Sequence, residues 1–268
     1  MTDVRVSRPS LPDPAERGTT PGRTAGALPA ISLDAPPAAG AGVALALGFA
    51  MGGRRVLGRS TALSALLGAA LVVVAALIER RVGSAGAVDR ALAGTFNVVV
   101  PLVSFGVAAA ISARRNLREG VWAAARYGVA RRDVALGAIA AGLAASATLG
   151  AAFAVLAVAV AHGPGNPPLA RDLLTSAWIG ALTAAAYASW FAAGATFGRR
   201  GGGRWVPLLA DFVLGGSAGL AGAILPRANA ASLLGSAPPL GLPHASSSLI
   251  LAASAVVLAG FAALRCRD

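Results

Sequence analysis

Long apolar stretches alternate with short polar connections along most of this chain. From about residue 60 onward, six stretches are long enough to cross a bilayer as helices, which takes about 20 residues. The six stretches are Thr61 to Ile78, Leu92 to Ala113, Val134 to Ala161, Leu173 to Phe197, Val206 to Leu225 and Ser248 to Leu264. The pattern predicts an all-α polytopic membrane protein with six transmembrane helices.

The segment that precedes the first span, residues 38–53, is apolar but short, and it ends in Gly52-Gly53-Arg54-Arg55. We expect an N-terminal helix that lies in the membrane interface, with Arg54, Arg55 and Arg59 at the lipid headgroups. The alternative is a seventh span, which would place the N-terminus on the outer side of the membrane.

The first 37 residues differ in composition from the remainder of the chain. They hold seven Pro and four Arg and no apolar core, a composition typical of disordered segments. The sequence therefore predicts two parts, a disordered cytoplasmic tail over residues 1–37 and a six-span membrane domain over residues 38–268.

The positions of the arginines predict the orientation. With six spans and a cytoplasmic N-terminus, 18 of the 23 arginines fall on the cytoplasmic side. Cytoplasmic loops of membrane proteins carry an excess of basic residues. We therefore expect an integral protein of the cytoplasmic (inner) membrane with both termini in the cytoplasm.

Composition excludes several functions. A net charge of +12 would suggest nucleic acid as a partner of a soluble protein, but here the charge lies in loops beside the membrane. The chain has no Lys, so it lacks the residue with which a P-loop reaches the phosphates of ATP. The single cysteine, Cys266, excludes an internal disulfide, and two isolated histidines predict no metal site.

The longest charged connection, residues 114–133, is the best candidate for a functional site. Spacings of four residues align Arg115 with Glu119, and Arg118 with Trp122 and Arg126. On a helix they would form one charged and aromatic stripe. The prediction is a short amphipathic helix at the cytoplasmic surface, which Gly128 ends. It either docks a soluble partner or serves only as a basic anchor of topology.

One acidic residue, Asp211, lies inside the fifth predicted span. An acid within a span is costly and is a functional candidate by default. Its position near the cytoplasmic end favours a structural pairing with Arg199, Arg200 or Arg204. A role in moving a substrate or a proton is the alternative.

The stretch from about residue 95 to residue 145 resembles type-2 ABC exporter permeases. The resemblance rests on Pro101-Leu102 in the second span, Glu119-Gly120, the turn Gly128-Val129-Ala130-Arg131, and Gly137 at the start of the third span. The number, spacing and orientation of the spans agree over roughly residues 40–268. Two positions depart from the family, which often has Pro at the position of Gly128 and Lys at that of Ala138.

This resemblance implies a transmembrane subunit of an ATP-driven exporter, with no ATPase site of its own. Its partners would be a soluble ABC ATPase subunit, which binds ATP and Mg, and a second permease copy or paralogue within the lipid bilayer. The helix at about residues 116–127 would act as the coupling helix, seated in a cleft of the ATPase. The docking residues would be Arg115, Arg118, Glu119, Gly120, Trp122, Arg126 and Arg131.

Two other functions remain open from the sequence. A membrane anchor or assembly factor would use the 114–133 connection for a different partner or for none. An ion-coupled carrier would depend on Asp211 instead. Spans built of Ala, Val, Leu and Gly do not define a substrate.

Overall fold

The computed structural model describes residues 40–83, 86–125, 128–163, 166 and 168–267, and these residues form helices and connections without a strand. The predicted tail, residues 1–37, lies outside this described part. The α-helices are α1 (Ala41–Val56), α2 (Arg59–Val82), α3 (Ala87–Gly94), α4 (Val100–Ile111), α5 (Leu117–Ala125), α6 (Arg131–Ala161), α7 (Leu169–Gly194), α8 (Trp205–Leu214), α9 (Leu220–Ile224), α10 (Pro226–Leu233) and α11 (His244–Arg265).

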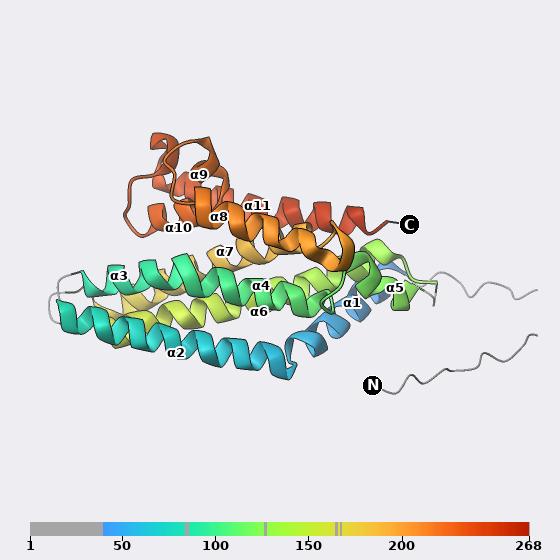
Figure 1. Ribbon diagram of the computed structural model, residues 1–268, viewed down its shortest axis with the longest axis horizontal. Helices are drawn as coiled ribbons and strands as arrows, with labels where there is room; N and C mark the ends of the chain where they lie inside the picture. The colour runs from blue at the N-terminus through green and yellow to red at the C-terminus, as the bar shows by residue number, and fades with distance from the viewer. Residues whose placement is uncertain (1–39, 84–85, 126–127, 164–165, 167, 268) are drawn as a thin grey trace, which may run out of the picture. The chain divides into compact units, whose positions relative to one another are not determined.

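The two longest helices, α6 and α7, form the centre of the membrane domain. They cross where Gly150 of α6 meets Gly180 of α7, and a Cβ atom on either residue would collide with the backbone carbonyl of the other. Small residues at such crossings let helix backbones approach closely in lipid. Helix α6 also packs against α1, α2, α4 and α11, so most of the domain is assembled around it (Figure 1).

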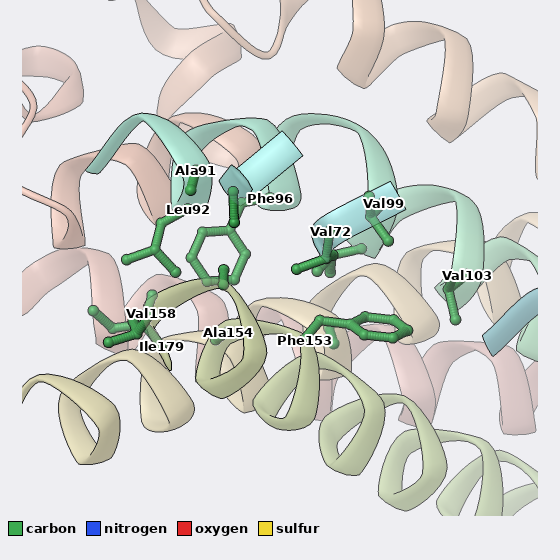
Figure 2. Close-up of a cluster of buried hydrophobic side chains, with 14 of the residues drawn as sticks. Val72, Ala91, Leu92, Phe96, Val99, Val103, Phe153, Ala154, Val158 and Ile179 are labelled. Carbon is green, nitrogen blue, oxygen red and sulfur yellow. The ribbon is translucent and has the colours of Figure 1, made fainter. Parts of the chain in front are cut away.

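An apolar cluster joins α2, α3 and α4 to the two central helices. Phe96 and Phe153 extend into it from opposite sides, together with Val72 of α2 and Ile179 of α7 (Figure 2). Phe96 and Phe153 are 2% and 3% exposed, so both rings are buried between the helices. Close contact of this kind, rather than hydrophobicity, holds helices together in lipid.

The second span contains an irregular turn. Between α3 and α4, residues Thr95–Val99 form a π-helical turn, η2, in which the Val100 N–H donates to the carbonyl of Thr95. Pro101 follows directly and cannot donate to the carbonyl of Asn97, four residues earlier. The wider π turn gives that carbonyl room, and turns of this kind are frequent at functional sites.

Helix α1 matches the predicted N-terminal helix of residues 38–53 in position, and it runs three residues further. Its small buried residues, including Gly48 and Gly52, pack against Val134 and Ala138 in the first turns of α6. Its larger apolar side chains, such as Phe49, stay exposed. Helix α1 therefore packs against α6 through a face of small residues, and the face that carries its larger apolar side chains stays exposed.

Four helical segments of the described chain are long and apolar enough to cross a membrane: Arg59–Val82, Ala87–Ile111, Arg131–Ala161 and His244–Arg265. They correspond to the first, second, third and last predicted spans, so the chain has the character of a membrane protein. Helix α7, the fourth predicted span, has sufficient length with 26 residues. It is less apolar because Thr183, Tyr187 and Trp190 lie along it, and its neighbours bury much of its surface.

The fifth predicted span, Val206 to Leu225, is not one continuous helix. Helix α8 ends at Leu214 after ten residues, and the backbone leaves the helix before α9 begins at Leu220. The interruption falls in the glycine-rich run from Gly215 to Gly219, where helix propensity is low. The short helices α9 and α10 then gather over one end of α7 and α11 (Figure 1).

Candidate functional site

The predicted short helix in the charged connection exists as α5. Its inner side is apolar, with Leu117 and Val121 fully buried and Ala124 nearly so, at intervals of four and three residues. These side chains join Val107 and Ile111 of α4 in a second apolar cluster. The helix is thus amphipathic as predicted, and its charged side chains extend from the opposite surface.

Asn116 fixes the beginning of α5. Its side-chain oxygen accepts a hydrogen bond from the Arg118 N–H at 3.0 Å, the arrangement of a helix N-cap. Its Nδ2 atom donates to the carbonyls of Thr196 and Gly198, both at 3.2 Å. The segment that follows α7 therefore holds the first turn of α5 in place.

Arg55 ties α5 to α1 and α4. Its guanidinium donates to the Ile111 carbonyl at 2.8 Å and to the Gly120 carbonyl at 2.9 Å. Burial lowers the pKa of Arg55 from its ordinary value. We expected Arg55 at the lipid headgroups; in the structure its side chain satisfies carbonyls at the end of α4 and within α5.

Gly120, predicted as a docking residue, instead faces inward. It is buried, and an added Cβ would lie 3.1 Å from the Ser112 carbonyl and 3.6 Å from Nη1 of Arg55. A glycine at this position lets α5 approach the end of α4 closely. Its role is to seat the helix rather than to contact a partner.

Arg204 also helps to hold the start of α5, by connecting the loop before α8 to the end of α4. It is 6% exposed, and burial lowers its pKa. Its guanidinium donates to the carbonyl of Gly201 at 3.0 Å and to Ser112 Oγ at 3.3 Å. Gly201 has a φ of +68° and lies against the Arg115 carbonyl, so the loop before α8 also contacts the start of α5.

The C-terminal end of α11 contacts α5. Arg118 Nη2 donates to the Arg267 carbonyl at 3.4 Å. The adjacent Cys266 is fully buried. Burial raises the pKa of its thiol to about 11, against the opposing influence of Arg118 and Arg265. The thiol is therefore protonated and unreactive at neutral pH.

Five of the seven predicted docking residues gather on one surface. They line a hollow of about 390 Å³ and are here called the α5 face: Arg115, Arg118, Glu119, Trp122 and Arg131. Trp122 is 43% exposed. The sixth, Gly120, lies beneath this surface, and the seventh, Arg126, lies outside the described residues. Arg131 reaches the hollow from the first turn of α6, across the turn that contains Gly128 with its φ of +73°.

A second hollow of about 560 Å³ adjoins the first. Arg115 and Glu119 line both hollows, and the second also includes Arg114, Arg199 and Arg200. The two hollows together offer arginines, a carboxylate and one large aromatic ring. Arginine and tryptophan are enriched among residues that dominate binding at protein interfaces, so this arrangement suits a protein partner with acidic groups.

Asp211 belongs to a different region. Its Oδ2 atom accepts a hydrogen bond from the Tyr187 hydroxyl at 2.8 Å, and Oδ1 faces the Arg227 N–H at 3.4 Å. Arg227 Nε in turn donates to Asn97 Oδ1 at 3.0 Å. These four residues, here called the polar cluster, come from α8, α7, α10 and the π turn.

The predicted pairing of Asp211 with Arg199, Arg200 or Arg204 is therefore wrong. Asp211 is 1% exposed and faces the short helix α10 rather than the loop before α8. The pattern of the sequence did not connect Asp211 with Asn97, Tyr187 or Arg227. A signal that could have found Arg227 is the pairing of an acid within a predicted span with the next arginine along the chain.

Neither region has the composition of a metal site, since no three His, Cys, Asp or Glu side chains come together anywhere in the described chain. The chain matches no protein-family model, and it has no match among curated proteins or solved structures. The functional interpretation consequently depends on the geometry of these two regions and on the sequence motifs.

Proposed function

We propose that this protein is the membrane-spanning subunit of an ATP-driven exporter of the type-2 ABC class. A separate soluble ATPase would bind ATP and Mg and dock on the α5 face. A second permease copy or a paralogue would complete the membrane part. In this arrangement both termini and α5 lie on the cytoplasmic side of the inner membrane.

The convergence of Arg115, Arg118, Glu119, Trp122 and Arg131 on one hollow is the observation that supports this proposal most. These residues come from two helices and the connection before them, yet all line one hollow. The motif Glu119-Gly120 has one exposed and one buried member. That division suits a docking helix, which must present charge outward and fit closely inward.

The attachment of α5 suits it to transmit force. Hydrogen bonds connect it to α1 through Arg55, and to the segment after α7 through Asn116. Its apolar side packs with residues of α4 and α6. A displacement of α5 would therefore move several spans together rather than bend one loop. ATP-driven closure of the docked ATPase subunits would then shift the membrane subunit between its inward and outward states.

The proposal requires six crossings, so α7 and α8 would cross or enter the bilayer in addition to the four apolar helices. Helix α7 is long enough, and its polar residues Thr183, Tyr187 and Ser189 are buried. Helix α8 would enter from the cytoplasmic side and stop at the glycine run, with α9 and α10 completing the outer end. Irregular backbone at membrane depth is tolerated where protein surrounds it.

Co-purification with a P-loop ATPase tests the docking proposal. The full-length tagged protein is extracted from its native membrane in mild detergent, and associated proteins are identified by mass spectrometry. The test variant combines Glu119→Arg with Trp122→Ala, which changes the charge and the aromatic group of the α5 face. The control is Arg132→Glu, which reverses an exposed charge beside Arg131 that does not line the hollow.

The exporter proposal predicts an ATPase in roughly stoichiometric amount with the wild type and the control, and its loss from the double variant. All three proteins should remain monodisperse in detergent, because exposed side chains contribute little to stability. A different cytoplasmic partner at the same face would favour the anchor or assembly function. Intact protein without any partner would contradict the docking role.

An ion-coupled carrier is the second candidate, because Asp211 is buried with a hydroxyl group and close to Arg227. Ionisable residues at membrane depth often mark proton or ion pathways. A carrier predicts that Asp211→Asn abolishes transport while Glu119→Arg leaves it intact. The exporter predicts the reverse order of effects, provided that both variants reach the membrane.

A further inference from the structure

A long apolar groove runs along the surface of α11, which faces α8 over one part of the groove and α9 over the other. Helices α8 and α11 pack on α7 but make little direct contact with each other, so α7 forms the floor between them. The first turns of α8 and the last turns of α11 lie at the end of the bundle that also carries α5 (Figure 1). The groove therefore extends from that end toward the short helices α9 and α10.

The groove has two connected parts, with volumes of about 340 and 500 Å³, which share Trp190 and Leu258. Its walls include exposed Val206 on α8, and Val257 and Phe261 on α11. The hydroxyl of Ser254 donates to its own helix, to the carbonyl of Leu251 at 2.9 Å. The lining is consequently almost entirely apolar apart from the Trp190 ring N–H, which has no hydrogen-bond partner among the described residues, and no described residue that lines it is acidic.

One end of the groove is basic. Phe197 and Phe261 line this end with ring centroids 6.1 Å apart. The Arg265 guanidinium lies 4.7 Å above the Phe197 ring. Arg199 and Arg200 come two and three residues after Phe197, but they line the second hollow beside α5. One end of the apolar groove thus lies beside the Arg265 guanidinium.

We propose that this groove binds an anionic phospholipid, with an acyl chain along α11 between α8 and α9 and the headgroup phosphate beside Arg265. The charge at one end and the apolar surface along the remainder match the two parts of such a lipid. A second copy of this chain that packed groove against groove would need an acidic group there to meet Arg265. None of the six acidic residues that the structure describes lines the groove: Glu79, Asp89, Glu119, Asp133, Asp172 and Asp211.

This lipid site goes beyond the exporter function and does not depend on it. It requires only that the domain resides in a bilayer, which the four long apolar helices support. Loss of the ATPase partner would leave the lipid site unaffected, and loss of the lipid site would leave the α5 face intact. The two proposals can therefore fail separately.

Trp190 provides the probe, because its side chain lines both parts of the groove. In the full-length protein, the other three tryptophans are replaced by Trp122→Phe, Trp178→Phe and Trp205→Phe. The protein is reconstituted in vesicles of phosphatidylcholine and phosphatidylglycerol in one fixed ratio. Bromine, which quenches tryptophan fluorescence on contact, is carried by the acyl chains of one lipid or the other, so the overall lipid composition never changes.

The proposal predicts stronger quenching by brominated phosphatidylglycerol than by brominated phosphatidylcholine. Each arginine near a headgroup enriches an anionic lipid by about fivefold. Arg265→Gln should therefore remove most of the difference, and the control Arg54→Gln, an exposed arginine outside the groove, should retain it. Ala253→Phe, which fills the groove, should reduce quenching by both lipids.

Two results would overturn the proposal. Equal quenching by the two lipids, unchanged by Arg265→Gln, would show ordinary boundary lipid without selection. No quenching by either lipid would show that another protein surface, such as a second copy, covers the groove. Monodisperse elution of every variant in detergent excludes misfolding as the cause of either result.

Discussion

The α5 face and the polar cluster use the same chemical groups in opposite surroundings. Both contain arginine and a carboxylate near an aromatic ring. On the α5 face, Glu119 is exposed at the surface of two hollows. In the polar cluster, Asp211 is 1% exposed and bonds with Tyr187. The first arrangement is open to a partner, and the second is closed by the chain itself.

The difference in burial has energetic consequences. An exposed charged side chain contributes little to folding because water and salt screen it. A buried charge needs its partners, since their removal leaves a desolvated group without compensation. We therefore expect substitutions in the polar cluster to affect stability, and substitutions on the α5 face to affect binding.

The largest expected effect follows from Asp211→Ala. It removes the acceptor of the Tyr187 hydroxyl and leaves Arg227 near a void, which should lower the free energy of unfolding by about 3 kcal/mol. Asp211→Asn keeps an acceptor and should cost about half as much. Thermal unfolding in detergent measures both, with Asp172→Ala on α7 as a partly exposed control. Equal melting temperatures for all proteins would contradict a structural role of the polar cluster.

The reactivity of Cys266 shows whether solvent reaches the contact between α5 and the C-terminal end of α11. The thiolate is the reactive form, and a pKa of about 11 leaves about a hundredfold less of it at pH 8 than in an ordinary thiol. Maleimide labelling should be about a hundredfold slower than in a Cys266→Ser, Arg267→Cys variant. It should rise about tenfold per pH unit. Rapid labelling at pH 7 would show that the C-terminal end of α11 is open.

The same group predicts a pH effect on stability. Because the folded-state pKa of Cys266 is raised, the native state favours the neutral thiol. This contribution is fully present below the ordinary thiol pKa of about 8.5 and is lost as pH rises toward 11. The melting temperature of the wild type should fall more than that of Cys266→Ala across this range.

Arg55→Met tests the connection between α5 and α1. Loss of two hydrogen bonds to carbonyls should cost about 1–2 kcal/mol, and the α5 amides should exchange with solvent deuterium about tenfold faster. The matched control is Arg54→Met, because Arg54 is the exposed neighbour on the same helix turn. Identical exchange in the two variants would show that Arg55 does not hold α5.

Glu119→Gln should have the smallest effect on folding, with a change of less than about 0.5 kcal/mol. Its effect should appear in binding, as loss of the co-purified ATPase. A large drop in melting temperature would instead place Glu119 among the structural residues and weaken the contrast between the two regions.

Much of the fold follows from hydrophobicity alone. Four of the six predicted spans correspond to helical segments long and apolar enough to cross a membrane, and α7 covers most of a fifth. The short amphipathic helix was also predictable, because Arg115, Arg118, Glu119 and Trp122 recur at helical spacing. The sequence did not reveal which of the 34 glycines allow close contact. Gly150 and Gly180 act as a pair only because α6 and α7 cross there.

The polar cluster lay beyond sequence reasoning for a similar reason. Its hydrogen bonds join residues separated by 16, 24 and 130 positions, so no local spacing connects them. The interruption after Leu214 was equally hidden, because Ala, Gly and Leu continue the apolar pattern beyond it. The carbonyl contacts of Arg55 were also hidden, because a basic residue at a helix end suits both a headgroup and a carbonyl, and only packing reveals which groups it meets.

Site-specific photo-crosslinking tests the central claim most directly. A photoreactive amino acid replaces Trp122 on the α5 face, and a second variant carries it at Val74, exposed on α2. Illumination of intact native membranes is followed by mass spectrometry of each adduct. The exporter proposal predicts an adduct with a P-loop ATPase from position 122 and none from position 74. An adduct with an unrelated protein, or equal adducts from both positions, would contradict the assignment of α5 as the docking site of an ATPase.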